Sequence, residues 1–147
     1  MIQVYRLHKS IYSPNQGIGA WKAGGRWTPK GMHAIYAAQS RALATLEVLV
    51  HHATIPVGFS ITSIRIPPGV PVYYKETALP SDWKENLLVT QAFGHNHLCN
   101  KLVISVPSAI IPKEWNFIFN TEHPEFHRIR FLESVPFAFD PRLKSAL

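Results

Sequence analysis

Four side chains within residues 24–47 could together bind an anionic substrate that carries a ring. Arg26 and Trp27 follow a glycine pair, Tyr36 ends a short strand-like run, and Glu47 lies on the helix predicted next. A guanidinium binds anions with a planar, bidentate fork, and an aromatic side chain offers a wall for a ring. A carboxylate held beside them could stabilise positive charge that develops during a reaction.

Glu47 is the sharpest candidate because it is the lone carboxylate on an otherwise apolar helix. Ser40 is a good N-cap, and the helix is predicted to run to about His52. Glu47 falls on, or at the edge of, the predicted buried stripe. The other side chains on that arc are Leu43, Leu46, Val50 and Thr54. A buried carboxylate is costly unless it is paired or functional, so two interpretations stay open: an ion pair to Arg6 or Arg26, and a catalytic carboxylate.

Two further candidates lie far from this stretch in the sequence. Arg6 lies in the predicted first strand, Ile2–Leu7, either as a surface arginine or as an anion-binding group on a rigid element. Ser108 follows the predicted strand Lys101–Val106, at a corner where its hydroxyl could face a cleft or simply form a turn. Neither a G-x-S-x-G motif nor an evident Ser-His-Asp triad accompanies it.

Several other kinds of site are disfavoured by the sequence. The glycines of the run GIGAWKAGG lack the G-x-G-x-x-G spacing of a dinucleotide-binding turn. His51-His52, with His95 and His97, form no Cys/His motif, so no metal is expected. The basic residues are dispersed, which argues against nucleic-acid binding despite a formal net charge of +6.

The totals favour one globular domain spanning residues 1–147. Hydrophobic residues make up 46% of the chain and charged residues only 16%. The first residues show no signal-peptide h-region, and no run of about 18 apolar residues occurs. With Cys99 as the single cysteine, a reducing, cytoplasmic setting is the simplest expectation.

The elements that must position these residues are six or seven short strands and two or three helices, without regular βαβ alternation. We therefore expect an α+β fold, a compact single domain with a mixed central sheet and few helices. Residues 8–25 are predicted to be a loop, and a helix over Leu87–Leu98 is expected to be interrupted or ended near Gly94. The remaining strands are predicted at Met32–Ala37, Phe59–Ile66, Val70–Tyr74, Asn116–Asn120 and Ile129–Phe139, the last with a break at Pro136.

Several motifs in this order resemble the RES-domain family, the toxin half of bacterial toxin–antitoxin pairs. They are YR near the start, GGRW, a strand ending in Tyr, SRALATLEVLVH, VPSAIIP with an asparagine soon after, N-x-x-HP and FDPRL. The resemblance covers nearly the whole chain. Two supporting loops depart from the family pattern, at residues 94–97, where G-D-x-W is often found, and at residues 120–126, where N-P-x-H-P-D-F is replaced.

The resemblance implies a fold similar to ADP-ribosyltransferases and cleavage of the nicotinamide–ribose bond of NAD. The catalytic residues that it implies are Glu47, Ser108 and Arg6. The residues that it implies for NAD binding are Arg26, Tyr36, Trp27 and Asn120. Which of Arg6 and Arg26 grips the substrate stays open, because both match arginine-bearing motifs.

The resemblance also implies a partner, an Xre-like helix-turn-helix antitoxin that covers the active site. NAD would be the substrate, so no cofactor is expected, and inorganic phosphate is a candidate co-substrate. We expect no direct nucleic-acid binding by this chain and leave open a homodimer within the antitoxin complex. Hydrolysis, phosphorolysis and transfer of ADP-ribose to a macromolecule remain alternatives, as does a basic nucleic-acid-binding module without catalysis.

Overall fold

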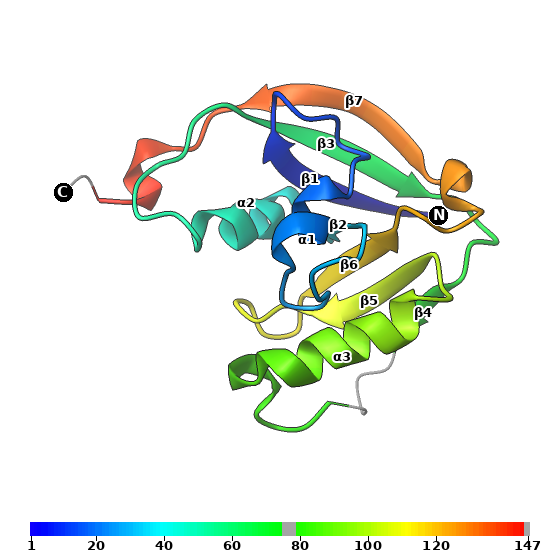
Figure 1. Ribbon diagram of the computed structural model, residues 1–147. Helices are drawn as coiled ribbons and strands as arrows, with labels where there is room; N and C mark the ends of the chain where they lie inside the picture. The colour runs from blue at the N-terminus through cyan, green and yellow to red at the C-terminus, as the bar shows by residue number, and fades with distance from the viewer. Residues whose placement is uncertain (75–78, 146–147) are drawn as a thin grey trace.

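A computed structural model of the protein describes residues 1–74 and 79–145. Within these residues the strands form one seven-stranded sheet, in the order β4-β5-β6-β2-β1-β3-β7 (Figure 1). The strands are β1 (Ile2–Lys9), β2 (Ala34–Ala38), β3 (Phe59–Ile66), β4 (Val72–Tyr74), β5 (Val103–Pro107), β6 (Trp115–Asn120) and β7 (Arg130–Phe137). β4 and β5 are parallel and the other neighbouring pairs are antiparallel. The predicted α+β class, with a mixed central sheet and few helices, is confirmed.

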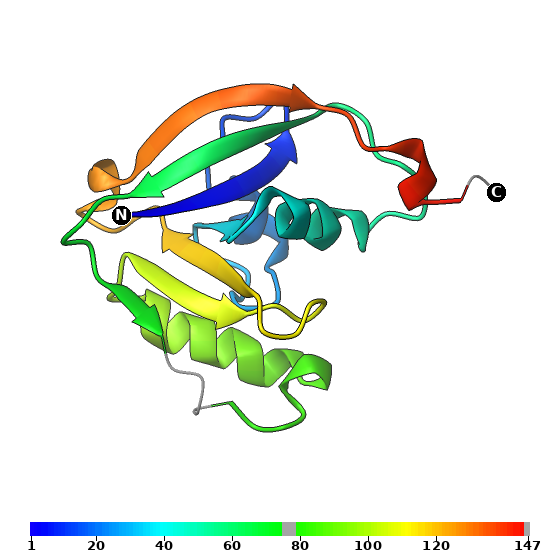
Figure 2. The same ribbon diagram turned by 180° about the vertical axis from the view of Figure 1, so that it is seen from behind.

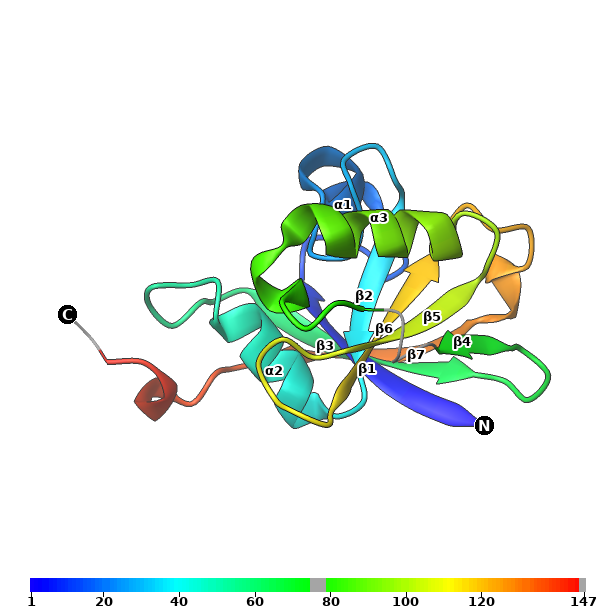
Figure 3. The same ribbon diagram turned by 90° about the horizontal axis from the view of Figure 1, so that it is seen from below.

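The helices pack on the two parts of this sheet. They are α1 (Ile18–Ala23), α2 (Arg41–Leu49) and α3 (Leu87–Leu98), with short 3-10 turns η2 (Trp83–Glu85), η3 (Phe126–Arg128) and η4 (Pro141–Leu143). α2 lies against β1, and α3 lies along β5 and β6 (Figures 1 and 3). None of the helices in the described ranges has the length and apolar character needed to cross a bilayer.

The sheet is divided into two halves that diverge from a single point. β1 and β3 pair along their whole length, whereas β1 and β2 are registered only at Tyr5 and Ala38. Figures 1 and 2 show β7, β3 and β1 as one layer that turns away from β2, β6 and β5. The largest buried cluster includes Val4 and Ile64 from the first half and Phe119 from the second. The core therefore holds the halves together where backbone pairing between them is sparse.

Helix α2 begins as predicted but ends sooner. The Ser40 hydroxyl accepts a hydrogen bond from the Leu43 N–H at 3.0 Å, which confirms the predicted N-cap. The helix ends at Leu49, and His51 and His52 follow in tight turns. Its buried side chains are Leu43, Ala44 and Leu49, whereas Val50 is 55% exposed and Glu47 is only half-buried. The buried face is thus rotated away from the predicted stripe.

Three other predictions about local structure were wrong. The predicted loop over residues 8–25 contains α1. α3 runs through Gly94 without a break, because the missing side chain lets the helix approach the loop before β2: a Cβ there would lie 1.5 Å from the Trp27 carbonyl oxygen. β7 continues through Pro136. Because β7 is an edge strand that pairs only with β3, it tolerates a residue that has no backbone N–H.

Candidate active site

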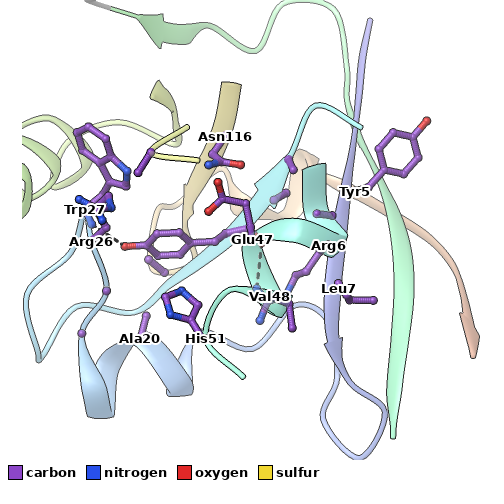
Figure 4. A pocket seen from close by; sticks show the side chains of 18 of the residues that line it. Tyr5, Arg6, Leu7, Ala20, Arg26, Trp27, Glu47, Val48, His51 and Asn116 are labelled. Atoms are coloured by element: carbon purple, nitrogen blue, oxygen red, sulfur yellow. Dashed lines mark hydrogen bonds between the residues drawn. The ribbon is translucent and has the colours of Figure 1, made fainter. Parts of the chain in front are cut away.

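A pocket of about 520 Å³ opens where β1 and β2 diverge (Figure 4). Its walls come from β1, α1, the loop before β2, β2 itself, α2, the start of α3 and β6. Such a volume is typical of small-molecule sites. The pocket brings together five of the residues singled out in the sequence: Arg6, Arg26, Trp27, Tyr36 and Glu47. Ser108 and Asn120 are not in its lining.

Ser108 holds the Glu47 carboxylate from behind the pocket. Its hydroxyl donates to Glu47 Oε1 at 2.7 Å and accepts hydrogen bonds from the backbone N–H groups of Ile110 and Ile111, at 3.0 and 3.1 Å. Because those two donors point at the hydroxyl oxygen, its proton is left for the carboxylate. Ser108 is 3% exposed. Its position is that of a group that orients Glu47 without reaching a ligand.

Glu47 itself faces the pocket and is half-buried. It takes part in none of the ion pairs of the described residues, so the structural pair to Arg6 or Arg26 considered above is not found. A carboxylate oriented by one hydroxyl, with no cation to neutralise it, remains available to a positively charged centre in a ligand.

Arg6 is a half-buried cation, with a fully buried Nε, that lacks an anionic partner. Its Nη1 donates to the Tyr36 carbonyl oxygen at 3.1 Å, while its Nε is buried with no hydrogen-bond partner among the described residues. Burial lowers the pKa of Arg6 to about 10, so the guanidinium is still charged at neutral pH. A buried charge without a counter-ion is costly. This arrangement is expected where a bound anion supplies the missing charge.

Arg26 has different surroundings at the same pocket. Its Nη1 donates to the Lys84 carbonyl oxygen at 3.0 Å, and its guanidinium carbon lies 5.9 Å from the centre of the Trp83 ring. These contacts fasten the loop before β2 to η2. Arg26 thus braces one wall of the pocket, whereas Arg6 has an unused buried donor.

Tyr36 and the GGRW motif form one clamped unit. The Tyr36 hydroxyl accepts a hydrogen bond from the Trp27 backbone N–H at 3.1 Å and bonds with the Thr28 hydroxyl at 2.8 Å. Burial raises the pKa of Tyr36, which keeps the phenol neutral. A Cβ on Gly25 would lie 2.6 Å from the Tyr36 hydroxyl oxygen, so only glycine fits there. Trp27, 2% exposed, anchors the loop beneath α3.

The lining also includes His51 and Asn116, which the sequence analysis did not predict as site residues. His51 lies on the rim, one helical turn beyond Glu47, and this i+4 spacing was a usable signal. Asn116, on β6, is 8% exposed and lines the pocket together with Glu47 (Figure 4). The sequence marked it only as the asparagine that follows VPSAIIP and gave it no role, because its place in the pocket depends on pairing with Ala38 of β2.

Asn120 was predicted to bind NAD, but the structure places it at the far end of β6. Its Nδ2 donates to the Leu98 carbonyl oxygen at 2.9 Å, and its Oδ1 accepts from the Glu122 N–H at 3.0 Å. These bonds tie α3 and the turn after β6 to the sheet, which is a structural role.

The site can therefore hold an anion at Arg6 and stabilise a cationic centre at Glu47, with an aromatic wall between. In the described parts of the chain, no group of three or more His, Cys, Asp or Glu side chains could hold a metal ion. The chemistry that the described side chains themselves offer is electrostatic stabilisation by a carboxylate and a guanidinium.

Comparisons with known proteins agree over the length of the chain. A family model described as the RES domain matches residues 3–140. A protein of Photorhabdus laumondii named "Toxin Res" is 37% identical over 152 residues, covering 97% of each chain. Another "Toxin Res", from Pseudomonas putida, is 33% identical over 139 residues, covering 91% of this chain and 95% of that protein.

A third relative and a solved structure extend these similarities. A Sphingobium protein named "Prs ADP-ribosylating toxin" is 34% identical over 137 residues, covering 86% of this chain and 84% of that protein. The crystal structure of the M. tuberculosis MbcT-MbcA toxin-antitoxin complex includes a chain with a similar fold. It superposes with a TM-score of 0.72 at 21% identity, covering 97% of this chain and 86% of that one.

Proposed function

This chain belongs to the RES-domain family, and we propose that it is the toxin of a toxin–antitoxin pair that depletes NAD by cleaving the nicotinamide–ribose bond. Relatives named as toxins support the first part of this proposal. The observation that supports the second is the pairing, in one pocket, of an unneutralised Arg6 with a Glu47 that Ser108 orients.

NAD carries chemical groups that are complementary to the side chains of this pocket. Its pyrophosphate would supply the anion for Arg6, through a charge-assisted hydrogen bond to the free Nε. Its nicotinamide ring would lie against Tyr36 and the small side chain of Ala38, which share one face of β2. Arg26 would then act by holding the loop that forms the opposite wall.

The proposed reaction breaks the bond between ribose C1′ and the nicotinamide nitrogen. The electron pair of that bond goes to the ring nitrogen, which leaves as neutral nicotinamide, so no general acid is needed. Glu47 would stabilise the oxocarbenium character at the ribose, as a carboxylate does in glycoside cleavage. An oxygen of water or inorganic phosphate then bonds to C1′, giving ADP-ribose with a proton released to solvent, or ADP-ribose 1-phosphate.

A second candidate is transfer of ADP-ribose to a macromolecule. It uses the same bond cleavage and the same Glu47, and differs only in the nucleophile. The Sphingobium relative named "Prs ADP-ribosylating toxin" favours it. For either activity we propose an Xre-like helix-turn-helix antitoxin as partner, a suggestion supported by the fold shared with a toxin of a solved toxin–antitoxin complex.

The deciding experiment measures nicotinamide release from NAD by purified protein free of antitoxin. Wild type should release nicotinamide, and Glu47→Gln should be at least a hundredfold slower, about 2.7 kcal/mol of lost transition-state stabilisation. Reactions with and without phosphate separate phosphorolysis from hydrolysis, and adenine-labelled NAD would mark a protein acceptor if transfer occurs. If wild type and Glu47→Gln are equally inert with phosphate present, the proposal fails, and salt-sensitive binding to DNA or RNA would then favour the nucleic-acid module.

A further inference from the structure

Asn116 carries a side-chain amide that is buried yet forms no hydrogen bond with any residue that the structure describes. The residue is 8% exposed, and its backbone is fixed on both sides, by Ala38 of β2 and Val106 of β5. Because Asn116 lines the pocket, its amide faces the pocket space and not a sealed core. A ligand bound in the pocket can therefore use the unpaired donor and acceptor of this amide.

The neighbours of Asn116 limit what that ligand group can be. Ala38 lies directly across the strand pair, and the next pair on the same face is Tyr36 with Ile118. Because side chains alternate along a strand, Tyr36, Ala38 and Asn116 share one face of the sheet. The small Ala38 leaves room for a flat ring between the Tyr36 aromatic wall and the Asn116 amide.

The negative charge of Glu47 further limits which substituent the bound ring can carry. Its carboxylate faces the same pocket as the Asn116 amide (Figure 4). A neutral substituent that both donates and accepts can pair with the asparagine amide through two N–H···O bonds. A carboxylate substituent can only accept, and it would share the pocket with the negative charge of Glu47, which is unfavourable.

We propose that Asn116 recognises the carboxamide of the nicotinamide ring and makes this pocket select a carboxamide over a carboxylate. This inference rests on the proposed NAD cleavage and specifies which pyridine dinucleotide is cleaved. Asn116 is a binding residue in this role. It leaves bond cleavage to Glu47 and determines which leaving group is held in place.

The experiment compares NAD with nicotinic acid adenine dinucleotide, which differs only in that substituent. Wild type should favour NAD at least tenfold in kcat/KM. Asn116→Leu keeps the side-chain size but removes both hydrogen-bonding groups, so the preference should fall at least tenfold, mainly through slower cleavage of NAD. Gln39→Ala is the matched control, because Gln39 braces the start of β6 by accepting from the Trp115 N–H at 2.7 Å and does not line the pocket. Its preference should equal that of wild type.

A binding measurement keeps the inference testable if Asn116→Leu does not fold. Nicotinamide titrated into ¹⁵N-labelled Glu47→Gln should shift the side-chain amide signals of Asn116, and nicotinate should not. Equal turnover of both dinucleotides by wild type, an unchanged preference in folded Asn116→Leu, or identical shifts with both pyridines would each overturn the role of Asn116 alone. If wild type cleaves neither dinucleotide, the proposed function itself fails.

Discussion

Ser108 contributes to the site from outside the pocket, through one hydrogen bond to Glu47. Ser108→Ala removes that donor and leaves the carboxylate free to rotate. We expect kcat for nicotinamide release to fall by about tenfold to a hundredfold, the value of a hydrogen bond to a charged group, with little change in KM. A serine that contacted NAD directly would instead raise KM.

A double-mutant cycle provides the control for this prediction. Because Ser108 acts through Glu47, adding Ser108→Ala to Glu47→Gln should cause almost no further loss of rate. Two independent losses that add would contradict the positioning role. The Ile110 and Ile111 N–H groups also lose an acceptor, so thermal unfolding must be measured alongside the kinetics.

Arg6 should reveal a conflict between stability and activity. The burial that lowers its pKa to about 10 corresponds to roughly 3 kcal/mol of destabilisation, offset by about 2 kcal/mol from its hydrogen bond to the Tyr36 carbonyl oxygen. Arg6→Met removes both, so we expect the free energy of unfolding at pH 7 to rise by about 1 kcal/mol while NAD cleavage is lost. Denaturant unfolding and nicotinamide release measure the two effects.

The difference in unfolding free energy between Arg6→Met and wild type should change with pH in one direction. The penalty on Arg6 is fully present below pH 10 and is relieved as the folded protein loses that proton before the unfolded chain does. The stability advantage of Arg6→Met should therefore shrink above pH 10. Arg26→Met is the matched control and should lower stability, because Arg26 braces the pocket loop on Lys84. A stability loss in Arg6→Met would contradict the buried-charge interpretation.

Part of the candidate site could be predicted from the sequence, namely the residues whose type is unusual for the element that carries them. A lone carboxylate on an apolar helix and an arginine in a strand suffice to suggest Glu47 and Arg6. Asn116 and Asn120 are chemically equivalent on the same strand, and only the register with β2 and the contacts of α3 show which one faces the pocket. That information is absent from local sequence.

At the scale of elements, the approach of α3 to the loop before β2 depends on Gly94. In Gly94→Ala the new Cβ would overlap the Trp27 carbonyl oxygen, so helix and loop must separate. We expect a loss of about 3 kcal/mol or more in unfolding free energy and a loss of activity, because the displaced loop forms a pocket wall. Chemical denaturation checks the first effect.

Gly19→Ala is the opposite case and the control. Gly19 lies within α1, and a Cβ there meets nothing within 4 Å. Alanine favours the helix and restricts the unfolded chain, so stability should rise by about 0.5–1 kcal/mol. Equal effects of the two substitutions would show that helical propensity, and not contact with Trp27, decides the outcome at Gly94.

Most predictions of helices and strands depended on periodicity and capping. They failed where tertiary contacts determine whether a helix or strand forms. The polar, glycine-rich segment before β2 gives no periodic signal, yet α1 forms within it, with Trp21 stacked on His33 at 5.4 Å. The apparent break at Pro136 disappears because β7 is an edge strand. Neither the packing partner nor the edge position can be derived from the local sequence.

At the scale of the whole molecule, a ligand in the pocket would join the two halves of the sheet. Arg6 belongs to the half containing β1, while Tyr36 and Asn116 belong to the half containing β2, and between the two strands only Tyr5 and Ala38 are in register. A molecule bound to both sets of side chains would link the two halves where β1 and β2 diverge and their backbones no longer pair. Binding should therefore change the stability of both halves together.

NAD bound to Glu47→Gln, which should cleave it only slowly, tests this coupling. At a hundred times its Kd it should stabilise the folded protein by about 2.7 kcal/mol, because it binds only the folded state. Amide hydrogen exchange should slow in β1 and β3 as well as in β2 and β6, since opening of either half must release the ligand. Arg6→Met should show neither effect at the same concentration. Protection limited to β2 and β6 would mean that the ligand contacts one half only, and the divergence of β1 from β2 would then need another explanation than substrate binding.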